Sequence, residues 1–567
     1  MKHFLNSIVL ALMAILVPAL AQAHDFAVNG IYYNITSDNE VEVTYKGTFW
    51  YPSAYQGVIA IPSSVSYDGK TYKVTSIGPE AFIMSDYLSS VSLPNSVTRI
   101  GEEAFFACEG LRSVTFGNGL ADIGPYAFYR CTSLTSVTLP GSLISIGQDA
   151  FVGCTGMTRV SLPSSVTTIG DLAFAECGLT SVTIPGSVTS IGENPFALCS
   201  ALKTITVASG NTTYNSHEGC NAIIETSTNK LISGCQNTTI LSSVTAIGES
   251  AFAGCTGLTS FSLPGTVTTI GAYAYEGCTS LTSVTIPGSV TSIGKNPFAY
   301  CSELTSIQIE NGNPNFDSRE GCNAIIAKAD NKLVSGCMNT TIPSSVTSLG
   351  EESFAGCTGL TAIDIPSTVT GIEWGAFLSS GLKSLDIPGT IDVIADFLCY
   401  DCSRLASVTL PKTVTRIGES AFEYSGLRSI EIPATVTYIG YDAFYYCSSL
   451  ANVYTYIKNP KKVEMPDNVF ENFYSNNYSW RTLHVPAGTT AAYQADKRWS
   501  DYFGHIEEMP GEVPGDVNCD GSVNISDVNE VIDAILSGAE FDSAFDVNGD
   551  GTVNISDINT IIAIILK

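Results

Sequence analysis

The chain has 567 residues, of which 26 are Lys or Arg and 54 are Asp or Glu, so its formal net charge at pH 7 is −28. Such a charge repels nucleic-acid backbones and anionic membrane surfaces, which excludes nucleic acid as a partner. Beyond the N-terminal apolar run, no stretch reaches the roughly 20 apolar residues that a membrane-spanning helix needs, so we expect no membrane span.

The first 23 residues are ordered like a secretory signal peptide. Lys2 is followed by apolar residues 8–20 and by the small residues 21–23. This is the basic, apolar and small-residue order of an export signal. The sequence therefore predicts residues 1–23 as a signal peptide. It also predicts a secreted, extracellular or cell-surface-associated protein that begins at His24.

A unit of about 23 residues makes up most of the chain and recurs about fourteen times, which is typical of a solenoid. It is clearest in residues 134–154, Leu-Thr-Ser-Val-Thr-Leu-Pro-Gly-Ser-Leu-Ile-Ser-Ile-Gly-Gln-Asp-Ala-Phe-Val-Gly-Cys. The unit carries a phenylalanine column and a cysteine column, and Cys108, Cys131 and Cys154 follow one another at intervals of 23 residues. Equal spacing means equivalent positions, so we expect these cysteines to form a column of thiols rather than bridges.

Each unit predicts two short extended segments and a turn. Leu-x-x-Val-x-Leu-Pro alternates inward and outward residues and stops at proline, as a short strand does. Val-Thr-x-Ile-Gly gives a second extended segment, and Ala-Phe-x-x-Cys turns the chain towards the next unit. The outward positions, such as Thr135, Ser136 and Thr138, form a hydroxyl-rich face. That face either contacts a partner at many points or is a plain solvated sheet surface.

This pattern resembles the BspA-like leucine-rich repeats of exported bacterial surface proteins. The resemblance implies a β-rich leucine-rich-repeat solenoid of parallel short strands, assigned here to residues 76–455. It also implies adhesion to, or binding of, a protein or glycan that the family does not identify. We assign residues 24–75 to an N-terminal cap and residues 456–508, which include Trp480 and Trp499, to a C-terminal cap. Exposed aromatics in the second cap would offer a platform for sugars, whereas buried ones would close the solenoid's apolar end.

Two irregular inserts interrupt the repeat at an offset of 102 residues, residues 219–235 and 321–337. In each, an Asn-Lys turn between two apolar runs predicts a β-hairpin. Each insert also has two cysteines, which form either a disulfide or two buried thiols. The candidate pairs are Cys220 with Cys235 and Cys322 with Cys337.

After a Pro/Gly-rich linker at residues 509–515, one twelve-residue pattern occurs twice. Calcium loops place oxygen ligands at positions 1, 3, 5, 9 and 12, a carbonyl at 7 and glycine at 6, and both copies meet this requirement. We therefore predict two Ca²⁺ ions. The expected ligands are Asp516, Asn518, Asp520, the Ser522 carbonyl, Asn524 and Asp527 in the first loop, and Asp546, Asn548, Asp550, the Thr552 carbonyl, Asn554 and Asp557 in the second.

Each loop is followed by one amphipathic helix, and position 12 is Asp where helix-loop-helix calcium sites usually have Glu. A duplicated loop and helix of this kind resembles the type I dockerin domain, over residues 516–567. The resemblance implies calcium-dependent docking to a cohesin-bearing protein, in one of two orientations because the halves are nearly identical. An isolated calcium-stabilised helix pair without a partner is the alternative. The positions that the resemblance places against a cohesin are Ile525, Ser526, Ile532, Asp533, Ile555, Ser556, Ile562 and Ala563.

No residues form a recognisable catalytic constellation, so we predict no catalytic residue. The histidines of the exported chain lie outside nucleophile and metal motifs, and the counterpart of His217 in the second insert is Arg319. Paired carboxylates such as Glu102-Glu103 and Glu351-Glu352 lie at repeat turns. The sequence therefore favours an exported, non-catalytic binding protein. The alternatives are a component of a cellulosome-like complex with a role in polysaccharide catabolism and, less favoured, a glycoside hydrolase.

Overall fold

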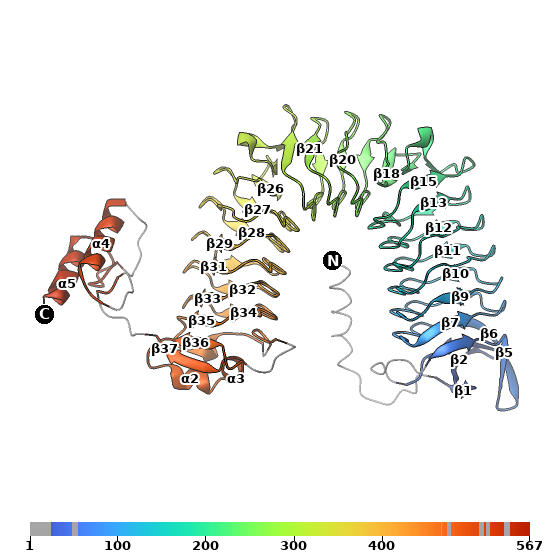
Figure 1. Cartoon of the computed structure of the whole chain (residues 1–567), viewed down its shortest axis with the longest axis horizontal. Helices are drawn as coiled ribbons and strands as arrows, with labels where there is room; N and C mark the ends of the chain where they lie inside the picture. Colours follow the sequence, from blue (N-terminus) through green and yellow to red (C-terminus); the bar gives the residue numbers. More distant parts are fainter. Residues whose placement is uncertain are drawn as a thin grey trace. The chain divides into compact units, whose positions relative to one another are not determined.

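The computed structural model describes residues 24–47, 55–466, 468–472, 478–509, 515–517, 522–537 and 545–566. The signal peptide predicted at residues 1–23 lies outside them. The chain divides into two compact units, Met1–Leu360 and Thr361–Lys567, and both carry rungs of the same kind (Figure 1). The predicted fold class is confirmed, because short parallel strands stack in a solenoid of about 23-residue repeats and helices occur near the C-terminus.

Strands on one side of the first unit come from the Leu-x-x-Val-x-Leu segments. Their inward residues are buried and their outward Ser and Thr are exposed, and Val182 lies opposite Ile205 in a parallel register. Pro185 and Pro287 directly follow two of these strands and end them, because proline has no N–H to donate to a ladder. These strands are β7 (Leu88–Ser92), β9 (Ser113–Thr115), β13 (Ser181–Ile184), β15 (Thr204–Val207), β21 (Ser283–Ile286) and β23 (Ser306–Ile309). β4 (Gly57–Ala60), from the N-terminal cap, pairs in parallel with β7.

The Val-Thr-x-Ile-Gly segments form the second extended ladder that the sequence predicts. The glycine is needed because successive rungs approach closely here: a Cβ on Gly147 would lie 2.6 Å from the carbonyl carbon of Gly124. The two-residue strands of this ladder in the first unit are β8 (Arg99–Ile100), β10 (Asp122–Ile123), β11 (Ser145–Ile146), β12 (Thr168–Ile169), β14 (Ser190–Ile191), β19 (Ala246–Ile247), β20 (Thr269–Ile270), β22 (Ser292–Ile293) and β27 (Ser348–Leu349).

Aromatic and thiol columns fill the space between the two ladders. The rings of Phe105 and Phe128 stack with centroids 4.9 Å apart and an interplanar angle of 4°. The thiol of Cys131 donates to the carbonyl oxygen of Phe105 at 3.2 Å, and Cys154 repeats this bond to Phe128 at 3.3 Å. The predicted column is confirmed, since all sixteen described cysteines are buried and free.

The N-terminal end of the solenoid is closed by antiparallel strands. β2 (Ile31–Ser37) pairs with β1 (Phe26–Val28) and β3 (Glu40–Thr44), and β5 (Ser64–Tyr67) pairs with β6 (Lys70–Ile77). β3 then pairs with β6 in parallel, and β6 with β8, so the cap continues directly into the second ladder.

Each insert is a hairpin that supplies one rung. In the first, β18 pairs antiparallel with β17 and parallel with β19, so the predicted hairpin is confirmed and its second strand takes the place of a repeat strand. The second insert repeats this arrangement. The insert elements are β16 (Tyr214–Asn215), η2 (His217–Gly219), β17 (Ile223–Glu225), β18 (Lys230–Ser233), β24 (Phe316–Asp317), η3 (Arg319–Gly321), β25 (Ile325–Ala327) and β26 (Lys332–Ser335).

The second unit continues the rungs with strands from the same two segments of the repeat. They are β28 (Gly371–Ile372), β29 (Ser384–Asp386), β30 (Val393–Ile394), β31 (Ser407–Thr409), β32 (Arg416–Ile417), β33 (Ser429–Ile432), β34 (Tyr438–Ile439) and β35 (Asn452–Thr455).

Elements outside the repeat cover the last rung of the second unit. β36 (Thr482–Val485) and β37 (His505–Glu508) extend the sheet, with η4 (Pro460–Lys462), α2 (Thr490–Gln494) and α3 (Lys497–Ser500) beside them. Trp499 and Tyr493 are fully buried, whereas Trp480 is 44% exposed. The guanidinium of buried Arg481 donates to the carbonyls of Phe470 and Cys447 at 2.6 and 3.1 Å. Most of the aromatic content of this cap therefore covers the solenoid end.

Candidate functional site

The second calcium loop is described in full. One carboxylate oxygen of Asp546 accepts the N–H of Asp550 at 3.0 Å, and the other accepts that of Gly551 at 2.7 Å. Gly551 has a φ of +85°, a conformation that glycine adopts without strain. The Asn548 side-chain oxygen also accepts the N–H of Asp550, at 2.8 Å. The loop thus curls around the ligand side chains at positions 1 and 3, as the motif requires.

Threonine at position 7 adds a contact that the motif does not demand. The N–H and the hydroxyl of Thr552 both donate to one carboxylate oxygen of Asp550, at 3.0 and 2.6 Å. These bonds favour the ionised carboxylate and hold the pKa of Asp550 below its usual value. Asp550 therefore offers an ionised carboxylate at a predicted ligand position.

The last two predicted ligands of the loop also begin the helix that follows it, α5 (Ile555–Ile565). Asn554 is the N-cap: its side-chain oxygen accepts the N–H of Ser556 at 2.8 Å, and its own N–H donates to Asp557 at 2.9 Å. The other oxygen of Asp557 accepts the N–H of Asn548 at 3.1 Å. The short Asp side chain at position 12 thus ties the loop to the helix N-terminus, a role that ligand spacing alone does not reveal.

The first loop repeats this arrangement where it is described. Buried Asp527 accepts the N–H of Val517 at 2.7 Å and that of Asn524 at 2.8 Å. The Asn524 side chain accepts the N–H of Ser526 and donates to the Ser522 carbonyl, which is the predicted position 7 ligand. The predicted ligands Asn518 and Asp520 lie outside the described residues.

The donor set suits Ca²⁺, a hard cation that takes carboxylate, amide and carbonyl oxygens. Among the described residues, no three His, Cys, Asp or Glu side chains already converge as a metal cluster. The acidic ligands of the second loop are instead spread along it, each held by N–H donors.

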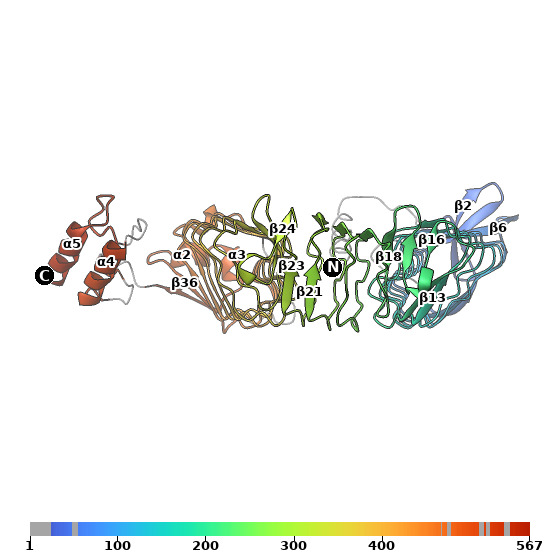
Figure 2. The same cartoon turned by 90° about the horizontal axis from the view of Figure 1, so that it is seen from above.

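The two helices pack as a pair, and Figure 2 shows them side by side (α4, Ile525–Ser537, and α5). Their common core is formed by Val528, Val531 and Ile561. Several other apolar residues of the predicted stripes are exposed: Ile535, Leu536, Ile562, Ile565 and Leu566. The helix pair therefore buries a narrower stripe than the apolar series suggests.

The predicted cohesin-facing residues gather at equivalent places of the two halves. Ile525 is 66% exposed and Ile555 69%, which is unusual for isoleucine. Ser526, Asp533, Ser556, Ile562 and Ala563 are exposed as well. Ile532 is partly buried against the helix-pair core. An exposed apolar residue at each helix start is consistent with the predicted contact.

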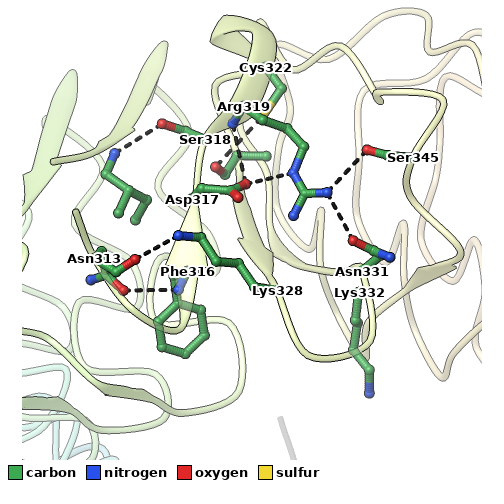
Figure 3. Close-up of polar contacts among 12 residues, drawn as sticks. Asn313, Phe316, Asp317, Ser318, Arg319, Cys322, Lys328, Asn331, Lys332 and Ser345 are labelled. Atoms are coloured by element: carbon green, nitrogen blue, oxygen red, sulfur yellow. Dashed lines mark hydrogen bonds and ion pairs between the residues drawn. The ribbon is translucent and has the colours of Figure 1, made fainter. Parts of the chain in front are cut away.

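The two inserts differ in the residue at one equivalent position, which is Arg319 in the second and His217 in the first. In the second insert the Arg319 guanidinium donates to Asp317 at 2.7 Å, to the Asn331 side chain at 2.9 Å and to the Ser345 hydroxyl at 3.2 Å (Figure 3). In the first insert the equivalent residue is His217, which is exposed. All four cysteines proposed as disulfide partners, Cys220, Cys235, Cys322 and Cys337, are free and buried in the structure.

Three of the side chains considered for catalysis have structural contacts. Lys295 pairs with Glu351 and Glu352 at 2.5 and 3.1 Å. His484 stacks on Tyr454 with ring centroids 4.2 Å apart. The strand positions Thr135, Ser136 and Thr138 are exposed, as a hydroxyl-rich face requires.

Comparison with known families matches two parts of the chain. The model described as BspA type leucine rich repeat region matches residues 75–203, 121–230, 222–322 and 334–451, which together cover more than half of the chain. The model described as dockerin type I domain matches residues 514–566. Both matches agree with the resemblances drawn from the repeat and from the paired loops.

Solved structures of bacterial leucine-rich-repeat proteins are similar to this chain. A leucine-rich cell surface protein from Faecalibacterium prausnitzii is 26% identical, with 77% of this chain and 95% of that one covered and a TM-score of 0.39. A leucine-rich repeat protein from Bacteroides ovatus is 25% identical, with 86% and 100% covered and a TM-score of 0.30. No curated protein matches the chain. Among the described residues, no helix is both long and apolar enough to cross a membrane.

Proposed function

Since the chain belongs to the BspA type leucine-rich repeat family, we propose that it is an exported, non-catalytic binding protein. Its solenoid engages a protein or glycan target at the cell surface or outside the cell. Its dockerin type I domain attaches it, through calcium, to a cohesin-bearing protein. The solenoid therefore determines which target is bound, and the dockerin domain determines which cohesin-bearing protein the chain joins.

The link between the calcium loop and the start of α5 is the observation that carries this proposal. Asp557 accepts N–H groups from both the loop and the helix cap, at 3.1 and 2.9 Å. A divalent cation bound to the loop neutralises its carboxylates and draws them together. Asp546, Asn548, Asp550, the Thr552 carbonyl, Asn554 and Asp557 hold that ion, and their counterparts in the first loop hold a second. Calcium would then order the helix starts that present Ile525 and Ile555.

The dockerin domain also favours a narrower role as a subunit of a polysaccharide-degrading, cellulosome-like complex. In that role the solenoid would bring a substrate or a cell surface to enzymes carried by other subunits. Incubating the purified chain with a panel of polysaccharides separates this role from hydrolysis by the chain itself. We expect no turnover, and turnover abolished by changing one carboxylate would contradict the non-catalytic assignment.

A calcium-dependent pull-down from the native organism's surface and culture fluid tests whether the solenoid and the dockerin domain bind different partners. The bait proteins are the natural chain, an Asp516→Ala/Asp546→Ala double variant, and a control with two exposed solenoid carboxylates removed, Asp364→Ala/Asp392→Ala. We expect one set of partners to be lost with the loop variant and with EDTA, and another set to be retained by all three. If every partner persists after both treatments, the docking role fails.

A further inference from the structure

One rung of the second unit carries a cysteine where most rungs carry the column phenylalanine. The segment Cys399-Tyr400-Asp401-Cys402 takes the place of a Phe-x-x-Cys turn such as residues 128–131. It is therefore a Cys-x-x-Cys sequence, a spacing that redox-active dithiols use. Both of its thiols are buried and free in the structure.

The turn brings the two cysteines together. The N–H of Cys402 donates to the Cys399 carbonyl at 3.2 Å, as the N–H of Cys131 does to the Phe128 carbonyl at 3.2 Å. A turn closed by such a bond holds its first and fourth Cα atoms within about 7 Å, and a disulfide joins Cα atoms about 4.4 to 6.8 Å apart. All four of these side chains are fully buried, so the first and fourth side chains of each turn enter the core together. Cysteine at both positions therefore places two sulfurs side by side.

The two thiols hydrogen-bond to each other. Burial and this bond raise the pKa of Cys399 well above its ordinary value. Burial also acts to raise the pKa of Cys402, but the hydrogen bonds of Cys402 with Cys399 and Ser380 outweigh burial and lower it. The Ser380 hydroxyl oxygen lies 3.3 Å from the Cys402 sulfur. The contact between the thiols agrees with the turn geometry.

Cysteines of adjacent rungs lack this geometry. Cys131 and Cys154 occupy equivalent positions of stacked rungs, and each thiol donates to a phenylalanine carbonyl, of Phe105 and Phe128 respectively. Rungs of a ladder lie about 4.8 Å apart and equivalent side chains run parallel, whereas the Cβ atoms of a disulfide lie about 3.5 to 4.5 Å apart. We therefore expect the column thiols to stay open in the folded chain.

A disulfide in the Cys399 turn leaves the surrounding hydrogen bonds in place. The Cys402 thiol donates to the Phe377 carbonyl at 3.0 Å, and this carbonyl also accepts the N–H of Ser380 at 3.0 Å. Loss of the thiol hydrogen therefore does not leave the carbonyl unpaired. The main-chain bond that closes the turn involves no sulfur, so it is kept as well.

We propose that Cys399 and Cys402 are a redox pair, which a small disulfide oxidises to an intramolecular disulfide. The proposal goes beyond the binding function, and it uses the proposed export only as the source of oxidant. The buried pair meets the oxidant while the chain folds or when the turn opens. A chain kept in reductant keeps both thiols.

The reaction is a thiol–disulfide exchange in two steps. A thiolate of the pair attacks one sulfur of the small disulfide, whose S–S bond breaks and whose other sulfur leaves and takes up a proton. The second cysteine then loses its proton and attacks the mixed disulfide, which releases the second small thiol. Two cysteine thiols are thus oxidised to one disulfide, and one small disulfide is reduced to two thiols.

Refolding of the full chain from urea in buffers of reduced and oxidised glutathione tests the pair. Free thiols are trapped with acid and alkylated, and trypsin then releases residues 384–404, which contain the pair and no other cysteine. Residues 131–159 form a matched control peptide, which contains two column cysteines, Cys131 and Cys154. We expect peptide 384–404 to reach half oxidation at an about tenfold lower proportion of oxidised glutathione than peptide 131–159. Equal oxidation of the two peptides would overturn the proposal.

The same titration of the chain kept unfolded in urea separates the folded turn from closeness in sequence. The refolded chain should hold the disulfide of peptide 384–404 at an about tenfold lower proportion of oxidised glutathione than the unfolded chain, because the turn brings the thiols together. An equal or higher proportion in the refolded chain would overturn the proposal. If the chain does not refold, the folded chain is titrated in urea below its unfolding midpoint, where the turn opens locally. A pair that stays reduced there, at proportions that oxidise it in the unfolded chain, would overturn the proposal too.

Discussion

The thiol of Cys131 donates a hydrogen bond to the main-chain carbonyl of Phe105, 3.2 Å away in the preceding rungs. The same bond recurs along the column, for example from Cys278 to Phe252 at 3.4 Å and from Cys447 to Phe422 at 3.1 Å. The cysteines of this column therefore act as small apolar residues with one weak donor each.

Thiol reactivity should follow from this burial. Burial raises the pKa of both Cys154 and Cys199 to about 12, so almost no thiolate forms at pH 8. We expect a thiol reagent to label at most Cys519, which lies outside the described residues, in the native chain. After denaturation without reductant it should label all 17 cysteines. A denatured count lower by four would instead indicate the disulfides Cys220–Cys235 and Cys322–Cys337.

Serine should replace a column cysteine better than alanine does. At the equivalent place in another rung the chain has Ser425, whose hydroxyl lies 3.2 Å from the sulfur of Cys447. Cys154→Ser keeps a donor for the Phe128 carbonyl and should cost less than about 1 kcal/mol. Cys154→Ala leaves that carbonyl with only the N–H of Cys131 as a donor, at 3.2 Å, and opens a small cavity, and should cost about 2 kcal/mol. Urea unfolding midpoints measure both changes, and an alanine variant as stable as the serine variant would contradict the hydrogen-bonded column.

The C-terminal cap should depend on Arg481. Its guanidinium satisfies the carbonyls of Phe470 and Cys447, both in the buried end of the solenoid. Arg481→Ala removes the guanidinium donors from both carbonyls, of which that of Cys447 keeps the N–H of Leu450 at 3.1 Å, and it also removes a fully buried side chain. We expect a loss of about 3 kcal/mol. Trp499 fluorescence during urea unfolding reports on the same cap, where this indole packs 5.7 Å from Phe470. Arg428 is exposed, so Arg428→Ala is the control. Equal losses of stability in the two variants would refute the role of Arg481 in stabilising the cap.

Stability should increase as the pH falls from about 7 towards 5. Glu423 and Asp442 have folded-state pKa values of about 7 and about 6, above their ordinary values of 4.5 and 3.8. The folded chain therefore binds protons in this range more readily than the unfolded chain does, which favours folding at the lower pH. Unfolding midpoints at pH 5 and pH 7.5 measure the effect. Glu423→Gln/Asp442→Asn should reduce the difference, and an unchanged difference in that variant would assign it to other groups.

Much of the fold could be predicted because the same residue types recur at equivalent positions of the repeat. The Phe105 and Cys108 columns recur at one interval, and that interval specifies a stacked solenoid with buried thiols. The Asn-Lys turns likewise predict the two hairpins. The sequence could not predict that β18 also takes the place of a repeat strand. Its parallel pairing with β19 depends on how the chain packs in three dimensions.

The candidate sites were predictable to different degrees. The ligands of the calcium loops follow from their spacing, whereas the capping role of Asp557 depends on side-chain directions that spacing does not give.

Calorimetry of the purified chain with a panel of cohesin modules, in calcium and then in EDTA, tests whether the C-terminal domain docks through calcium. We predict that at least one cohesin binds in calcium, that EDTA abolishes this binding, and that Asp516→Ala/Asp546→Ala abolishes it too. The Asp364→Ala/Asp392→Ala control should bind like the natural chain. Binding that survives EDTA and the loop variant unchanged would contradict a calcium-dependent dockerin.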